Sequence, residues 1–131
     1  MLQILKSKAR EYGFDFQSKT FNIDFETGAI SALEQVFTGS KISGCLFHFG
    51  QCVWRKVQAL GFSTEYNTYS DVRVWVRLAV SLALVPLNRL DDAFLLFEGL
   101  SPSQLTSYQI TGFLDYMVET WIDEIEGKFA R

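Results

Sequence analysis

Two carboxylates, Asp24 and Glu26, lie where an alternating apolar pattern gives way to a helical one. If the alternating segment is a strand of an α/β sheet, Asp24 lies at its carboxyl end, where such sheets hold ligands. A carboxylate at that edge can bind Mg²⁺ through oxygen. The alternative is structural: Asp24 caps the following helix and Glu26 complements the helix dipole. On these residues alone the capping role is the stronger interpretation.

Cys45, His48 and Cys52 have the spacing C-x₂-H-x₃-C, which suggests a zinc site. In a strand, positions 45 and 48 would point to opposite faces and lie about 10 Å apart. They converge only if the backbone turns before His48, whereas Cys52 lies within about 6 Å of His48 once a helix has begun. His48 is the only histidine, so the fourth ligand must be a carboxylate or come from another chain. These requirements disfavour zinc relative to a buried cysteine and a hydrogen-bonded histidine at the strand end.

Basic residues interleaved with aromatics can bind single-stranded nucleic acid by stacking and phosphate contacts. Four such residues lie beside tryptophans: Arg55 and Lys56 after Trp54, and Arg73 and Arg77 on either side of Trp75. The 12 Lys and Arg against 15 Asp and Glu leave a net charge of −3, which gives no strong attraction to a phosphate backbone. The solvated face of an amphipathic helix therefore explains these residues better, and we expect weak or no nucleic-acid binding by this chain alone.

The length of 131 residues suffices for one domain and is too short for two ordinary ones. Hydrophobic residues make up 48% of the chain and aromatic residues 15%, a composition that forms a core and argues against disorder. Two cysteines are too few for a disulfide framework and fit a reduced, intracellular protein. The N-terminal segment 1–14 alternates charged and apolar residues, so we expect no secretion signal. The longest apolar run, Leu78–Leu87, is roughly half the length that spans a bilayer, so it predicts a buried helix.

The first half of the chain alternates helices and strands. The pattern predicts helices over 2–12, 26–37 and 48–60, with strands over 19–25 and 42–47 between them. This order is typical of an α/β fold with right-handed crossovers, although two strands alone make a marginal sheet.

Strand signals end at Gly61, and the second half is predicted to be all helical. One helical face runs from Trp75 to Leu82, and the next runs from Leu90 to Phe97. Ser101-Pro102 is predicted to start another helix, and the last apolar stripe, from Ile110 to Ile125, spans about four turns. The chain therefore divides into a βα part, 1–61, and a helical part, 62–131.

Several of these segments together resemble a Mutator-like element (MULE) transposase domain. In that family a DFE sequence follows a short strand, an AL..VF helix comes next, and a GC.FHF.Q..WRK.Q segment follows. The matching residues here are FNIDFE at 21–26, AI.AL..VF at 29–37, GCLFHFGQ at 44–51 and WRKVQ at 54–58. The later helical segments, 78–86, 93–100 and 114–122, are similar to the helical region of the family, so the resemblance covers nearly all of the chain.

The resemblance implies a partial ribonuclease H-like fold followed by a helical insertion. It also implies a nuclear, metal-dependent DNA transposase whose D-D-E triad binds Mg²⁺ or Mn²⁺. Asp24 would be the second acid and metal ligand, and Cys45 and His48 would form the C/D-x-x-H motif. Arg55 and Lys56 are the weaker candidates for DNA contact.

The same resemblance places the first acid upstream of Met1 and the final Glu downstream of Arg131. Glu119 and Glu124 lie too close to the 116–122 motif to be assigned as that Glu. Two-metal phosphoryl chemistry needs several carboxylates to hold ions about 4 Å apart. We therefore expect an internal fragment of a transposase that is inactive alone.

The alternative is a non-enzymatic helical interaction protein, or a domesticated transposon-derived module. In either case an uncovered sheet edge favours association with another chain.

Overall fold

The computed structural model describes residues 1–123 and divides the chain into two compact units, with the boundary between Phe49 and Gly50. The boundary falls inside helix α3 (Leu46–Ala59), so this helix contributes residues to both units. The boundary predicted near residue 61 marks where strand signals stop in the sequence. The boundary of the compact units instead reflects which residues pack against one another. The two units are described separately below.

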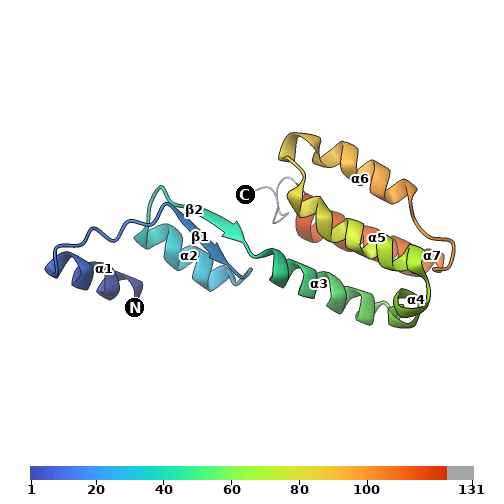
Figure 1. Ribbon diagram of the computed structural model, residues 1–131, viewed down its shortest axis with the longest axis horizontal. Coiled ribbons are helices and arrows are strands. Elements are labelled where there is room, and N and C mark those ends of the chain that lie inside the picture. The colour runs from blue at the N-terminus through green and yellow to red at the C-terminus, as the bar shows by residue number, and fades with distance from the viewer. Residues whose placement is uncertain (124–131) are drawn as a thin grey trace. The chain divides into compact units, whose positions relative to one another are not determined.

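The first unit is a β-α-β arrangement preceded by a helix. Its elements are α1 (Leu2–Glu11), β1 (Thr20–Ile23), α2 (Thr27–Val36) and β2 (Lys41–Gly44) (Figure 1). The strands pair in parallel and form a two-stranded sheet. Two parallel strands interleaved with helices are the α/β order that the sequence predicts.

The register of the sheet separates an apolar face from a polar one. Phe21 pairs with Ile42 and Ile23 pairs with Gly44, so these residues share one face. The backbone pairing extends one residue past β2, because the N–H of Cys45 donates to the carbonyl of Ile23 at 2.8 Å. Both strands therefore reach their carboxyl ends at the same sheet edge.

Phe37, directly after α2, forms the centre of the first unit and is 1% exposed. Its ring centroid lies 5.4 Å from that of Phe16 and 4.8 Å from that of Phe21. The ammonium of Lys6 lies 4.9 Å from the same ring and donates to the carbonyl of Val36 at 2.9 Å. One aromatic side chain thus joins α1 and β1 to the end of α2.

Both strands are shorter than predicted. β1 ends before Asp24, and β2 ends at Gly44 rather than Phe47. Phe25 lies beyond the end of β1, and its ring packs so closely over Gly44 that a Cβ there would overlap it. Helix α3 begins at Leu46, two residues earlier than the sequence suggests.

As far as residue 123, the second unit contains helices and no strand, as predicted. Besides the rest of α3 it contains α4 (Ser63–Thr68), α5 (Ser70–Ser81), α6 (Leu90–Gly99) and α7 (Ser107–Met117) (Figure 1). Two 3₁₀ turns, Leu82–Leu84 and Leu87–Arg89, connect α5 to α6, and a π-helical turn, Val118–Ile122, follows α7. The short helix α4 was not predicted, because its polar sequence has no apolar stripe.

Trp75 on α5 forms the centre of the second unit and is 1% exposed. Its ring stacks on that of Phe97 with centroids 5.0 Å apart and planes at 11°, and its indole N–H donates to the Phe97 carbonyl at 3.1 Å. Phe113 lies 5.0 Å from the same indole and 5.8 Å from Phe62. These four rings join α5, α6 and α7 to the segment before α4.

The predicted helix start at Ser101-Pro102 is wrong, because this segment is a connection in which Pro102 is buried. Helix α7 instead begins after Thr106, whose hydroxyl accepts from the backbone N–H of Gln109 at 3.2 Å. The Gln109 side chain accepts in turn from the Thr106 N–H at 3.0 Å, which completes a capping box.

The last predicted helix changes character before its expected end. Regular α-helix stops at Met117, and the π-helical turn carries the chain to Ile122. Ile125 and Glu124, which the sequence analysis considered, lie outside the described residues.

The apolar run Leu78–Leu87 is not one helix, since α5 ends at Ser81 and 3₁₀ turns follow. Between residues 1 and 123, no helix combines the length and the apolar character needed to cross a membrane.

Candidate functional site

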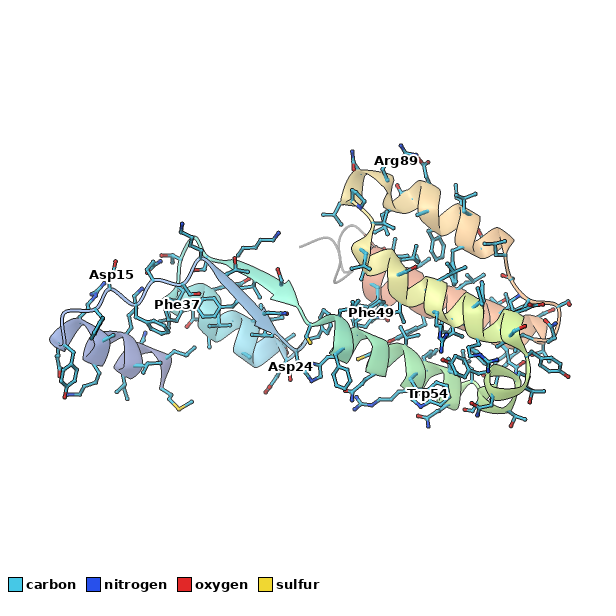
Figure 2. All side chains as sticks on the ribbon, viewed as in Figure 1. Asp15, Asp24, Phe37, Phe49, Trp54 and Arg89 are labelled. Carbon is cyan, nitrogen blue, oxygen red and sulfur yellow. The ribbon has the colours of Figure 1, made fainter. Side chains whose placement is uncertain are left out.

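Asp24 is the first residue after β1, and its side chain is exposed at the carboxyl end of that strand (Figure 2). Within residues 1–123 it has no hydrogen-bond or ion-pair partner. An ionised carboxylate without partners retains its full capacity to accept hydrogen bonds or bind a cation. Asp24 is therefore chemically available at the position that the sequence analysis assigned to it.

The structural alternative for Asp24 is wrong. The residue at the N-cap of α2 is Glu26, whose backbone carbonyl accepts from the N–H of Ile30 at 3.1 Å. No side chain makes a capping hydrogen bond at this end of α2. Neither carboxylate therefore satisfies the free N–H groups of the helix.

Cys45 is the last residue before α3, and the N–H of Phe49 donates to its carbonyl at 3.0 Å. It therefore occupies the N-cap position, and His48 lies in the first turn. The backbone turns immediately after Cys45, so the strand geometry that would separate these side chains by about 10 Å does not apply. At a helical i, i+3 spacing, their Cβ atoms lie about 5–6 Å apart.

Asp24 and Cys45 occupy corresponding positions on neighbouring strands. Each directly follows one of the last paired residues, Ile23 and Gly44. Adjacent strands lie about 4.8 Å apart, so the parallel register brings the two residues to the same edge of the sheet. The structure thus places Asp24 beside the C-x-x-H segment.

His48 is half-buried, and its ring packs edge-on against that of Phe47 with centroids 5.7 Å apart. Its Nδ1 is fully buried and has no hydrogen-bond partner in the described part of the chain. A buried polar atom without a partner costs about 1–3 kcal/mol. The expectation that hydrogen bonds hold this histidine is therefore not met at Nδ1.

Cys52 lies in the second unit, and both cysteines are free thiols. Among residues 1–123, no three His, Cys, Asp or Glu side chains are grouped so that they could hold a metal ion. The carboxyl end of the sheet offers the carboxylate of Asp24, and the side chains of Cys45 and His48 do not complete a three-residue metal site with it. A divalent ion there would need most of its ligands from water or from other residues.

Two basic residues proposed for DNA contact differ in their surroundings. Arg55 on α3 is exposed. The Lys56 ammonium lies 5.2 Å from the centre of the Tyr116 ring on α7. Burial raises the pKa of the Tyr116 phenol above the usual range of tyrosine, against a smaller lowering by a hydrogen bond with Trp121. Because its ammonium lies against the Tyr116 ring, Lys56 is partly held by packing, whereas the Arg55 side chain is exposed.

The stacking interpretation does not hold for the second basic pair. Trp75 is a core residue, so no nucleotide base can reach it. The Arg73 guanidinium donates to the carbonyls of Tyr66 and Asn67 at 3.1 and 3.2 Å, where it completes the end of α4. Of this pair, only Arg77 is exposed.

Sequence reasoning missed the part of Phe25 in this site. Because its ring closes over Gly44, the residue after Asp24 is fixed against the end of the neighbouring strand. A glycine inside a predicted strand, as Gly44 is in the segment 42–47, can mark such a close approach and could have indicated it.

Comparisons with protein-family models, with curated proteins and with solved structures find no match to this chain.

Proposed function

We propose that this chain carries the second-acid segment of a MULE-like, ribonuclease H-type DNA transposase. The observation that carries the proposal is the register of β1 and β2, which brings Asp24 and Cys45 to one sheet edge. The Asp24 carboxylate has no hydrogen-bond or ion-pair partner in residues 1–123, and the C-x-x-H segment forms the start of helix α3 beside it. A structural carboxylate would be expected to accept a capping or paired hydrogen bond.

In such a transposase, the divalent ion would polarise phosphate oxygens and activate the attacking nucleophile. On this chain, Asp24 would hold Mg²⁺ or Mn²⁺ through its carboxylate oxygens. A protein with this activity acts on chromosomal DNA, so we propose a nuclear location.

We further propose that these 131 residues are inactive by themselves, since one acid of three cannot position two ions. Incubation with supercoiled DNA and Mg²⁺ or Mn²⁺ should give no nicked or joined product. Nicking that disappears in Asp24→Ala, and persists in the matched variant Glu26→Gln, would contradict this proposal.

Metal binding separates the proposal from a purely structural role. We expect weak Mn²⁺ binding, seen as loss of the free-ion signal in electron paramagnetic resonance, that is reduced in Asp24→Asn and unchanged in Glu26→Gln. An affinity equal in all three proteins would argue against Asp24 as the ligand. Elemental analysis of protein purified without added metal should find no stoichiometric zinc.

DNA contacts by Arg55 and Lys56 can be ranked. Since Lys56 already lies against Tyr116, Arg55→Ala should weaken any salt-sensitive DNA binding more than Lys56→Ala. Equal or reversed effects would show that the packing of Lys56 does not limit it.

A non-enzymatic interaction protein is the second candidate function. The observation that favours it is the exposure of Leu95 and Leu96 on α6, at 65% and 72%. Large exposed apolar side chains that adjoin one another mark interaction surfaces more often than isolated ones do.

A further inference from the structure

Helix α6 has an exposed outer face that combines leucines with carboxylates. Leu95 and Leu96 are among its most exposed side chains. Asp91, Asp92 and Glu98 are exposed as well, and their helical spacing places them around the two leucines. We call these five residues the α6 surface.

The α6 surface carries an excess of negative charge. The helix contains three acidic residues and no basic one. Only Asp92 has an ion-pair partner in the described chain, Arg89, at 3.2 Å between highly exposed side chains. A partner that buries these leucines must therefore bring apolar contacts together with positive charge.

Helix α1 has the complementary composition. Ile4, Leu5 and Tyr12 are 66%, 53% and 78% exposed, and no residue of α1 is fully buried. Helical spacing places Lys8 among these three side chains, and we call the four residues the α1 surface. With Lys6, Lys8 and Arg10 against Glu11, α1 is basic whereas α6 is acidic. Lys6 is held against Phe37, and Lys8 forms an exposed ion pair with Glu11 at 2.6 Å, so the α6 carboxylates would share Lys8 with Glu11.

We propose that the α6 surface binds the α1 surface of a second copy of the chain. The contact would bury apolar side chains of both surfaces away from water, and Lys8 would approach the carboxylates around Leu95 and Leu96. The contact is head-to-tail, so two copies can close it reciprocally or further copies can extend it. This association goes beyond the proposed transposase function, and it uses neither the carboxyl end nor the unpaired lateral edge of the sheet.

Two helices of ten residues each bury less than a standard interface of about 1,600 Å², so the association is weak. Sedimentation equilibrium from about 10 µM to 1 mM should show an average mass that rises above the monomer with concentration, at affinities near the weak end for proteins. The rise should diminish at high salt, because exposed charges are screened.

Paired apolar variants test both surfaces. Leu95→Gln with Leu96→Gln, and separately Ile4→Gln with Leu5→Gln, should each raise the dissociation constant at least about tenfold. Leu84→Gln is the matched control, because Leu84 is 71% exposed but lies outside both surfaces. Unchanged circular dichroism would show that the variants remain folded.

A charge reversal makes the test specific to the proposed pairing. Lys8→Glu and Asp91→Lys should each weaken association alone, and a mixture of the two variants should recover it. A mixture of Lys8→Glu with Asp115→Lys should not recover association, because Asp115 lies outside the α6 surface. A mass that stays monomeric at all concentrations would overturn the proposal. Association that is unaffected by the α6 variants would also overturn it, and would point instead to the unpaired lateral edge of the two-stranded sheet.

Discussion

The two compact units of this protein are stabilised to different degrees. Among the described residues, the first unit buries three hydrophobic side chains, Leu33, Phe37 and Phe49, while the second buries fourteen. The first unit contains a sheet of only two strands, a size that is marginal without further covering. The candidate site belongs to this sparsely packed unit, so the residues available for chemistry lie apart from the main source of stability.

Removing the indole of Trp75 should have the largest effect on stability. Trp75→Ala removes a stacked ring and a buried hydrogen bond, so the free energy of unfolding of the second unit should fall by about 3–5 kcal/mol. Urea denaturation followed by circular dichroism measures this loss. Trp54→Ala, at a half-buried position against Tyr66, is the control and should cost clearly less.

The next test asks whether the two units unfold separately. All three tryptophans, Trp54, Trp75 and Trp121, lie in the second unit, so their fluorescence reports on it alone. Phe37→Ala should destabilise the first unit by about 3 kcal/mol, because the ring contacts both β1 and the segment before it. Circular dichroism should then show an early transition while the fluorescence midpoint stays fixed. Coincident shifts of both signals would mean that the chain unfolds as one unit.

Gly44→Ala should have a smaller effect confined to the first unit. The added Cβ overlaps the Phe25 ring, and forcing that ring aside should cost about 1–3 kcal/mol. The double variant with Phe25→Leu should recover part of the loss. Gly28→Ala on α2 has open space around it and should instead stabilise by roughly 0.5–1 kcal/mol. Equal effects of the two glycine substitutions would contradict the packing of Phe25 on Gly44.

The smallest effect concerns pH and the second unit. Burial favours the neutral phenol of Tyr116, so its folded pKa is raised above the unfolded value of about 10. The contribution of the neutral phenol to the free energy of unfolding is fully present below pH 10, and it is lost as pH rises through the folded pKa. The stability of the wild-type protein should therefore fall more steeply above pH 10 than that of Tyr116→Phe. Parallel pH profiles would show that the phenol is equally solvated in both states.

The sequence predicts the order of elements well, because each depends on a local period. The stripe from Phe49 to Leu60 predicts most of α3, and Phe21 with Ile23 predicts β1. The ends of the elements depend on nonlocal contacts. Phe25 lies beyond the end of β1 and its ring covers Gly44, nineteen residues further along the chain, a contact that the local periods do not specify.

The candidate site could be predicted only in part. Residue type and spacing single out Asp24, Cys45 and His48, but the proximity of Asp24 to Cys45 depends on the register of β1 with β2, and that of His48 to Cys45 on where α3 begins. Trp75 shows the opposite limit, since a tryptophan between two arginines has the pattern of a stacking site and proves to be a core residue.

Paramagnetic NMR with Mn²⁺ tests the central claim most directly, because the ion broadens signals of residues near it. Substoichiometric Mn²⁺ should broaden the backbone amides around Asp24 and Cys45, and this broadening should vanish in Asp24→Asn and persist in Glu26→Gln. Broadening confined to the acidic residues of α6, or unchanged in Asp24→Asn, would contradict a metal-binding role for the sheet edge.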